Sequence, residues 1–308
     1  MKILFVSSSN RFGEISPIVQ AQANSIASNN ISIEFFKISE NGMKGYLNAV
    51  FPLRRKIQKG KFDIIHAHYS LSGFVAALAG AKPLIVSLMG SDVKSRSLSK
   101  FLVRFFKLFF WEVTIVKSAD MQRTLNVNNV EIIPNGVNIK KFYPICQSEA
   151  IKFLCWNTNT KHILFPSNPS RLEKNYKLLN KSIQLIKYNI EIHFLKDIAH
   201  EEVNYYYNAA DIIALPSLRE GSPNAIKEAM ACNRPIVSTN VGDVNYLLEN
   251  VQGTFISSYA PEDFAIKIEK ALQFMKSNGR ERIKEIKLLS EDIALRLIEI
   301  YKRTLRKK

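Results

Sequence analysis

Short apolar runs alternate with longer amphipathic stretches along almost the whole chain, and turn-forming residues follow most of the runs. Eleven runs have the length and composition of buried strands. They lie at residues 2–8, 31–38, 63–69, 83–90, 111–118 and 130–136, and then at 162–168, 190–196, 211–217, 234–239 and 253–258. Buried strands that alternate with helices form parallel sheets covered on both faces. The pattern therefore predicts an α/β protein with two such sheets.

The alternation loosens between residues 138 and 161, where no strong strand pattern is present. A chain of 308 residues also suits two domains of about 150 residues each. We therefore expect one domain over residues 1–145 and a second over residues 146–288. The remainder, 289–308, predicts a C-terminal helix, because it begins with acidic residues, ends with basic ones and has apolar residues at helical spacing.

The segment 95–111 combines aromatic and basic residues at helical spacing. Leu98, Phe101, Leu102, Phe105 and Phe109 form an apolar stripe, with cationic residues toward another face. This arrangement is typical of a helix that lies at a membrane interface and binds anionic lipid. A helix that covers the sheet and turns its charged edge to water explains the pattern equally well.

Charge and cysteine usage narrow the class of protein. The formal net charge is +16, and residues 1–145 hold 19 Lys and Arg against 8 Asp and Glu. This excess indicates an anionic partner, which could be a phospholipid surface, a phosphorylated substrate or nucleic acid. The three cysteines are far apart and have no histidine at metal-ligand spacing. They indicate reduced thiols in a cytoplasmic protein and no metal site, and we expect no membrane-spanning helix.

The segment 215–248 has the strongest chemical pattern. A strand at residues 211–215 leads into a loop of Glu220, Gly221, Ser222, Pro223 and Asn224, and a helix then begins. Backbone amides at a helix N-terminus attract phosphate, glycine permits close approach, and proline at a helix start lacks a donor where none is needed. A diphosphate is expected to bind at this loop.

Glu220 and Glu228 are separated by seven residues, which places one in the loop and the other in the helix. Carboxylates on either side of a phosphate site can accept hydrogen bonds from sugar and ribose hydroxyls. Without a ligand, Glu220 would cap the helix and Glu228 would face solvent. The string EGSPNAIKEAMACNRPIVSTNVG resembles the E-x7-E segment of the family 4 retaining glycosyltransferases (glycosyl transferases group 1), and the similarity extends over nearly the whole chain.

This resemblance implies a GT-B fold, in which two Rossmann-like domains face a cleft and the C-terminal helix packs back on the first domain. It implies that Glu220 contacts the donor sugar and Glu228 the ribose. Arg171 and Lys174 match the cations that neutralise the donor diphosphate, although their spacing is shorter than is usual in the family. Gly13 matches the glycine-bearing loop after the first strand, where the family commonly has paired glycines.

Two further stretches resemble acceptor-side loops of the family. In DIIHAHYSLSGF, His66 and His68 are expected on opposite faces of a strand, and His68 on the acceptor side. In PLIVSLMGSDV, Met89 stands where many relatives have a histidine, which puts a histidine-assisted role at this position in doubt. Asp92 is either an acceptor contact or a helix N-cap. Asn135 and Gly136 resemble the family's turn after the last strand of the first domain.

The resulting functional prediction is a retaining, metal-independent glycosyltransferase of polysaccharide or cell-surface glycan biosynthesis. It needs no cofactor beyond its substrate, a UDP- or GDP-type nucleotide-diphosphate sugar, and its acceptor is a glycan or a lipid-linked glycan. We expect a location in the cytoplasm, at the inner face of the membrane if residues 95–111 bind lipid. The alternatives are a nucleotide-sugar epimerase of the same fold and a non-catalytic polyanion-binding protein, although no nucleic-acid-binding motif is present.

Overall fold

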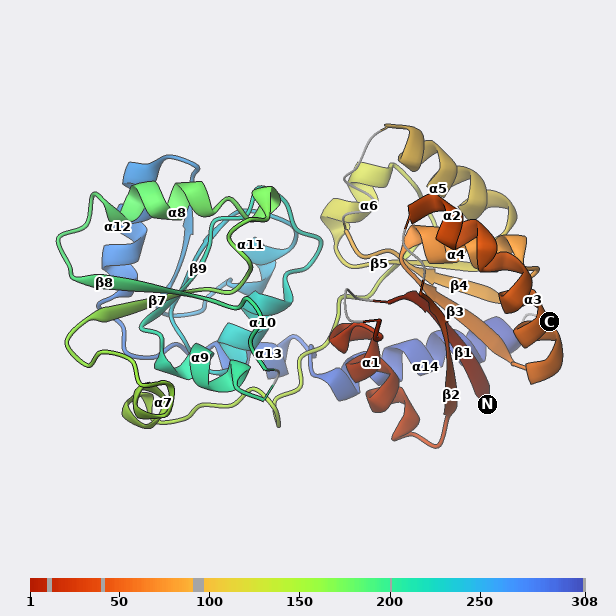
Figure 1. Ribbon diagram of the computed structural model, residues 1–308, viewed down its shortest axis with the longest axis horizontal. Helices are drawn as coiled ribbons and strands as arrows, with labels where there is room; N and C mark the ends of the chain where they lie inside the picture. Colours follow the sequence, from red (N-terminus) through yellow and green to blue (C-terminus); the bar gives the residue numbers. More distant parts are fainter. Residues whose placement is uncertain (10–12, 40–41, 91–96, 200, 307–308) are drawn as a thin grey trace. The chain divides into compact units, whose positions relative to one another are not determined.

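The computed structural model describes residues 1–9, 13–39, 42–90, 97–199, 201–306 and divides into two compact units. Unit 1 comprises Met1–Gly136 together with Ser290–Lys308, and unit 2 comprises Val137–Leu289. Figure 1 shows that each unit has a central sheet with helices on both faces. All eleven predicted strands are present, and the two parallel sheets confirm the predicted fold class.

Unit 1 contains a parallel sheet in the order β2-β1-β3-β4-β5-β6. Ile3, Leu4, Phe5 and Val6 are fully buried in β1, as expected for a strand covered on both faces. The strands are β1 (Lys2–Ser8), β2 (Ser32–Ile38), β3 (Ile64–His68), β4 (Leu84–Ser87), β5 (Val113–Val116) and β6 (Glu131–Ile132).

Seven helices in the described part of unit 1 cover this sheet. Helix α1 begins after Ser16, whose hydroxyl accepts a hydrogen bond from the amide of Val19, and Pro17 occupies its first turn. One face packs against α2–α6 and the other against α1 and α14 (Figure 1). The helices are α1 (Pro17–Ala27), α2 (Gly42–Asn48), α3 (Val50–Gly60), α4 (Ser70–Leu78), α5 (Ser97–Phe109), α6 (Ala119–Leu125) and α14 (Ser290–Arg306).

Helix α14 lies against α1, and its Tyr301 side chain is buried in the interior of unit 1. The Tyr301 hydroxyl lies 2.7 Å from Nδ1 of His66, and the other ring nitrogen of His66 lies 2.8 Å from the Ser87 hydroxyl. The prediction that the C-terminal helix packs on the first domain is therefore confirmed.

Unit 2 contains a parallel sheet in the order β11-β10-β9-β7-β8, with β8 at one edge. Helices α8 and α12 pack on one face. In the remaining helical layer, α7 packs against α9 and α10 packs against α13. The elements are α7 (Gln147–Leu154), β7 (Lys161–Phe165), the short 3-10 helix η1 (Leu172–Lys174), α8 (Tyr176–Ile183), β8 (Ile190–Phe194), α9 (Val203–Ala209), β9 (Ile212–Leu215), α10 (Asn224–Ala231), β10 (Ile236–Thr239), α11 (Val244–Leu247), β11 (Thr254–Ser257), α12 (Pro261–Ala271) and α13 (Gly279–Glu285).

The chain enters unit 2 earlier than the predicted domain boundary at residue 145, because unit 2 begins at Val137. Side chains of unit 2 bind the segment between the two positions. The Arg280 guanidinium donates to the carbonyls of Ile139 and Phe142, and the Asn208 amide donates to the carbonyl of Tyr143. Residues 137–145 form no helix or strand, so they have no hydrophobic periodicity that could have assigned them to unit 2. The second crossing, at Ser290, is within one residue of the prediction.

Among the described residues, no helix is both long enough and apolar enough to cross a membrane.

Candidate donor site and family

The loops that follow β7 and β9 carry most of the predicted donor-site residues, and the loop that follows β10 packs against the β9 loop. Lys174 follows β7, Glu220 follows β9, and Gly242 follows β10. Because these strands are parallel neighbours, their carboxyl ends lie at one edge of the sheet. Residues far apart in sequence therefore come together at this edge.

Glu220 and Lys174 form an ion pair between two of these loops. The Lys174 ammonium lies 2.5 Å from Oε1 of Glu220, and each side chain is 14% exposed. The Ser217 hydroxyl donates to the same carboxylate oxygen at 2.8 Å. The amide of Leu218 also donates to the carbonyl of Glu173. The loop pairing holds the Lys174 charge at a fixed position beside Glu220.

Gly242 lies directly against the loop that carries Glu220. A Cβ atom at Gly242 would approach the carbonyl oxygen of Gly221 to 2.6 Å, and the φ angle of Gly242 is +62°. Both observations require glycine at this position. The hydroxyl of Thr239, the last residue of β10, donates to the carbonyl of Ser217. The β10 loop therefore shapes the 217–222 segment.

Ser222, Pro223 and Asn224 lead into helix α10, with Pro223 at the N-cap position. Ser222 accepts a hydrogen bond from the buried ammonium of Lys227 at 3.0 Å. Oδ1 of Asn224 is buried and has no hydrogen-bond partner among the described residues. The helix N-terminus, with its amides and a nearby cation, has the features of an anion-binding site.

Burial and opposite charges set the ionisation of the groups beneath this loop. Burial lowers the pKa of Lys227 to about 8, although the charges of Asp243 and Glu228 favour its protonated form. Burial also raises the pKa of Asp243, opposed by Lys227 and by a hydrogen bond with Ser222. A lysine and two carboxyl groups therefore share a poorly solvated site.

Glu228 points back from α10 toward α9. Its Oε2 accepts a hydrogen bond from the Tyr207 hydroxyl at 2.7 Å. Burial raises the pKa of Glu228, while this hydrogen bond and the charges of Lys227 and Lys141 act in the opposite direction. The carboxylate is thus partly buried and held by Tyr207 rather than free in solvent.

Arg171 makes a different contact from Lys174. Its guanidinium pairs with Glu173 at 2.6 Å, and its side chain is 56% exposed. The structure therefore brings Lys174 to Glu220 and places Arg171 in a surface ion pair. Its role toward a diphosphate stays a prediction.

The predicted residues of unit 1 lie near the carboxyl ends of its strands. Gly13 adopts a φ of +74° after β1. His68 and Met89 border a cavity of about 240 Å³, which serines at the end of β1 and in the loop after it also line. Both ring nitrogens of His68 are buried without a hydrogen-bond partner among the described residues. Asp92 lies outside the described residues.

The prediction that His66 and His68 lie on opposite strand faces is wrong. Their rings stack with centroids 4.4 Å apart. Residues two apart in a strand point to the same face, because the side-chain period of a strand is two. His66 is fully hydrogen bonded in the interior, whereas His68 borders the cavity.

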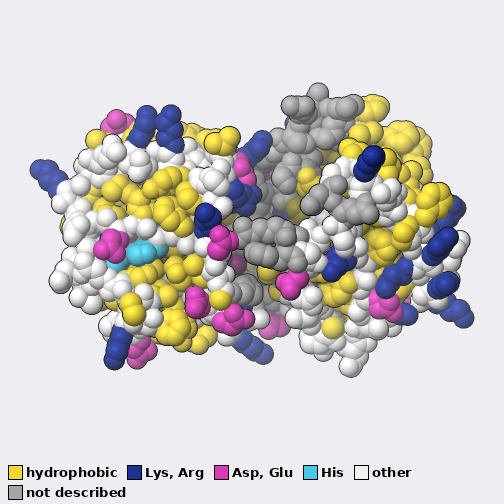
Figure 2. All heavy atoms as spheres, in the orientation of Figure 1, with side chains coloured by type: hydrophobic (Ala, Val, Ile, Leu, Met, Phe, Trp, Pro, Cys, Tyr) yellow, Lys and Arg dark blue, Asp and Glu magenta, His cyan; other side chains and the backbone are white. Residues whose placement is uncertain are grey.

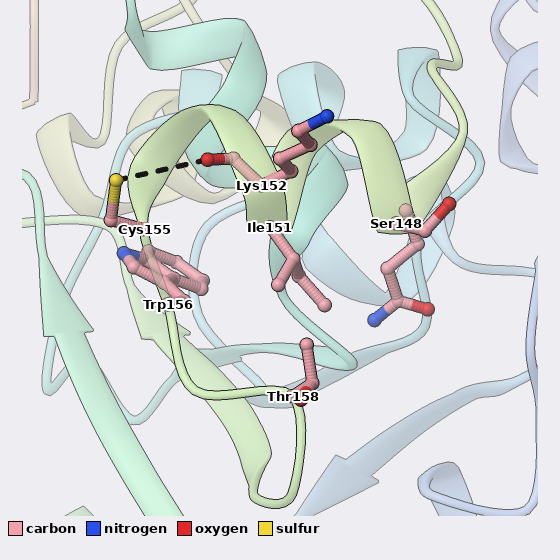
Figure 3. Close-up of a pocket in the computed structure, with 7 residues that line it drawn as sticks. Ser148, Ile151, Lys152, Cys155, Trp156 and Thr158 are labelled. Atoms are coloured by element: carbon pink, nitrogen blue, oxygen red, sulfur yellow. Dashed lines mark hydrogen bonds between the residues drawn. The ribbon is translucent and has the colours of Figure 1, made fainter.

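Several residues of the site gave no recognisable sequence signal. Tyr207, Ser217, Lys227 and Asp243 contact the predicted donor residues from other elements or from unremarkable positions in the same string. The sequence shows that Lys227 precedes Glu228, but it does not show that the Lys227 side chain is buried. A larger cavity in unit 2, of about 670 Å³, contains none of the predicted residues and is lined by Trp156 and residues of α7 (Figure 3).

Family models match both parts of the chain. The model described as Glycosyltransferase Family 4 matches residues 23–141, and the model described as Glycosyl transferases group 1 matches residues 161–273. The second match includes Lys174, Glu220 and Glu228. Neither family model supports the epimerase or polyanion-binding alternatives.

Comparisons with individual proteins agree with these models. A UDP-Gal:alpha-D-GlcNAc-diphosphoundecaprenol alpha-1,3-galactosyltransferase of Escherichia coli is 24% identical, and the match covers 77% of this chain and 74% of the relative. Among solved structures, a sucrose-phosphate synthase from Thermosynechococcus elongatus has a TM-score of 0.85 at 17% identity, covering 99% of this chain and 100% of that one.

The HepE protein of Anabaena in complex with UDP-glucose has a TM-score of 0.76 at 15% identity, covering 98% of this chain and 100% of the other. These structural similarities show a shared fold. The two family models, which together match most of the chain, show that it belongs to the family 4 glycosyltransferases, and the structural similarities show the GT-B fold.

Proposed function

We propose that the protein transfers a sugar from a UDP-sugar to a lipid-linked glycan, with retention of anomeric configuration and without a metal ion at the donor site. The ion pair between Lys174 and Glu220 is the observation that carries the proposal. It places a fixed cation beside a carboxylate at the carboxyl edge of the unit 2 sheet. The names of two similar proteins support the substrates, since one uses UDP-Gal and a diphosphoundecaprenol acceptor and another binds UDP-glucose.

In this proposal the residues of unit 2 stabilise the leaving nucleoside diphosphate. Negative charge develops on the diphosphate as the bond to the sugar breaks. Lys174 and the amides at the start of α10 stabilise that charge, and the buried Lys227 adds a positive field. These groups take the place that a divalent cation has in metal-dependent transfer.

The two glutamates hold the donor through its hydroxyl groups. Glu220 accepts hydrogen bonds from the donor sugar, and Glu228, positioned by Tyr207, accepts them from the ribose. The leaving phosphate accepts the proton of the acceptor hydroxyl on the face from which it departs, so the new bond forms on that same face. This route requires no protein nucleophile.

Helix α5 supports a membrane location for the acceptor. Its exposed side chains include Phe101, Phe105, Leu108 and Phe109, and Figure 2 shows hydrophobic side chains gathered over α5 and the helices beside it. Val103 instead packs in the core. Lys100, Arg104 and Lys107 flank the exposed aromatic residues. Aromatic groups with neighbouring cations fit an anionic lipid surface, which we propose to be the cytoplasmic face of the membrane.

The test of the donor site is binding and hydrolysis of UDP-, GDP- and ADP-sugars in the presence of EDTA. We expect saturable binding of UDP-sugars, reduced at least about tenfold in both Lys174→Ala and Glu228→Ala, because each variant loses a charge-assisted contact. Lys177→Ala is the matched control, since Lys177 is an exposed lysine on α8.

Loss of binding in EDTA that Mg²⁺ or Mn²⁺ restores would contradict metal independence. Equal binding by wild type, Lys174→Ala and Glu228→Ala would contradict the donor site itself. The anomeric configuration of the product, measured by NMR before mutarotation, tests retention separately.

A further inference from the structure

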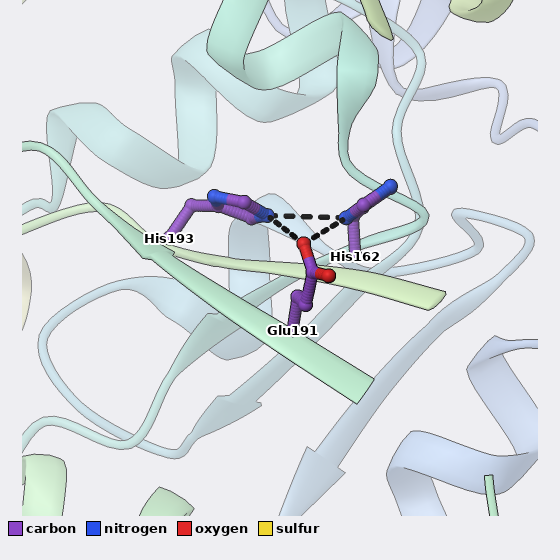
Figure 4. A group of neighbouring side chains, drawn as sticks. All are labelled: His162, Glu191 and His193. Carbon is purple, nitrogen blue, oxygen red and sulfur yellow. Dashed lines mark hydrogen bonds and ion pairs between the residues drawn. The ribbon is translucent and has the colours of Figure 1, made fainter. Parts of the chain in front are cut away.

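Three side chains of unit 2 that play no part in the donor site converge on one point. His162 lies on β7, and Glu191 and His193 lie on the neighbouring edge strand β8 (Figure 4). In the register of the two strands, His162 pairs with Glu191, and His193 is two residues further along. All three side chains therefore project from the same face of the sheet.

The distances between their ligand atoms match a small first-row cation. Nδ1 of His162 lies 3.1 Å from Nε2 of His193, and Oε2 of Glu191 lies 3.8 Å and 3.9 Å from these two nitrogens. A point equidistant from the three atoms is about 2.1 Å from each, which is the bond length of Zn²⁺ to imidazole nitrogen and carboxylate oxygen. Imidazole ligands disfavour Mg²⁺ and Ca²⁺, which prefer oxygen.

The surroundings fix both imidazole rings. Nε2 of His162 lies 2.8 Å from the carbonyl oxygen of Asn157, so this nitrogen carries the proton and donates it. The lone pair of Nδ1 then faces the convergence point, as in metal sites where a carbonyl orients the ligand histidine. Trp156 stacks on His193 with centroids 3.3 Å apart and an angle of 7° between the planes.

We propose that His162, Glu191 and His193 bind a Zn²⁺ ion, with water completing the coordination on the exposed side of Glu191. Two neutral imidazoles and one carboxylate with an open position form a recognised zinc ligand set. The His162 side chain is 1% exposed and the Glu191 side chain 40%, so the ion is reached from solvent on one side.

The site joins the edge strand β8 to β7 and to the loop at Trp156 and Asn157. His162 is the second residue of β7, whereas Lys174 follows the carboxyl end of that strand. The zinc ion therefore stabilises the amino-terminal side of the sheet and takes no part in sugar transfer. Without metal, the same contact between the two rings is a histidine–histidine hydrogen bond.

The test uses untagged full-length protein, treated with EDTA and dialysed, and titrated with Zn²⁺ against a chromophoric chelator. We expect one Zn²⁺ per chain, an increase in thermal midpoint with Zn²⁺, and tetrahedral absorption bands when Co²⁺ replaces it. Affinity should fall at least about tenfold in His193→Gln and in Glu191→Gln, because each loses one of three protein ligands. Glu191 is partly exposed, so its substitution tests the site even if His193→Gln folds poorly.

Two controls separate this site from adventitious binding. Glu262→Gln removes an exposed carboxylate of the same unit, and Cys155→Ser removes an exposed thiol beside Trp156. Both variants should bind Zn²⁺ as wild type does. Binding that is absent in wild type, is unchanged in both ligand variants, or is lost in Cys155→Ser would overturn the proposal. UDP-sugar binding by Glu191→Gln should equal that of wild type, so failure of the zinc site leaves the donor site untouched.

Discussion

At the scale of single residues, unit 1 contains an imidazole that is kept neutral in the interior. His66 has a partner for each ring nitrogen, Tyr301 on α14 and Ser87 on β4. Burial, together with the charge of Lys117, lowers the pKa of His66 to about 3. In the unfolded chain the same group titrates near 6.5.

We therefore expect acid to destabilise the protein through His66. Between the two pKa values the unfolded chain binds a proton that the folded chain does not, so the free energy of unfolding falls as pH falls from about 6.5 toward 3. The contribution is about 1.4 kcal/mol per pH unit at most. Denaturation across this range should show a shallower pH dependence for His66→Gln. A slope identical to that of wild type would contradict this role.

Gly242 provides a residue-scale prediction for the donor site. In Gly242→Ala the new methyl group meets the Gly221 carbonyl, so the Glu220 loop must shift. UDP-sugar binding should fall at least about tenfold, because small displacements of polar groups weaken oriented contacts strongly. Gly80→Ala is the matched control, since Gly80 has a φ of +80° with no atom within 4 Å of an added Cβ. Equal donor binding by the two variants would contradict the argument.

At the scale of elements, periodicity predicts strands well and the role of an amphipathic helix poorly. The eleven apolar runs became the eleven strands because a strand buried on both faces is apolar at every position. For residues 95–111 the sequence allowed two roles. The structure shows that α5 packs on the sheet of unit 1, and membrane binding by its exposed side stays a prediction. Val103 packs in the core while Phe101, Phe105 and Phe109 are exposed.

We expect α5 to bind vesicles that contain anionic phospholipid. The double variant Phe105→Ser/Phe109→Ser should lose most of this binding in a sedimentation assay, since two exposed aromatic side chains leave the interface. Leu185→Ser/Met275→Ser removes two exposed apolar residues of unit 2 and is the matched control. Equal vesicle binding by the two double variants would contradict binding through α5. Binding that does not weaken at higher salt would contradict the attraction to anionic lipid.

At the scale of the whole molecule, the chain crosses between units twice, at Gly136 and at Leu289. Arg280 joins the first stretch of unit 2 to the end of α10, because its guanidinium donates to the carbonyls of Ile139 and Phe142 and to that of Ala231. Together with Asn204 and Asn208 of α9, this guanidinium binds a segment that forms no helix or strand of its own.

Arg280→Ala should lower the free energy of unfolding by about 3 kcal/mol, because three carbonyl groups lose a charged donor. The measurement is chemical denaturation followed by the fluorescence of Trp156, which lies in unit 2, with Trp111→Phe as the common background. Lys276→Ala, an exposed cation nearby, should change stability by no more than about 0.5 kcal/mol. An Arg280→Ala transition that coincides with that of Lys276→Ala would rule out this anchoring role.

The sequence alone determined the two parallel sheets, the C-terminal helix and the string from Glu220 to Glu228, because these depend on local periodicity and on residues adjacent in the chain. Tertiary structure decided what the local pattern does not contain. Lys174 reaches Glu220 across 46 positions, and Tyr301 reaches His66 across 235. His162 meets Glu191 and His193 only because β7 and β8 pair in one register. The unit boundary likewise depends on Arg280, far along the chain from the segment it binds. Contacts of this kind depend on which elements pack together and in what register, and the spacing of hydrophobic residues along the chain does not determine either.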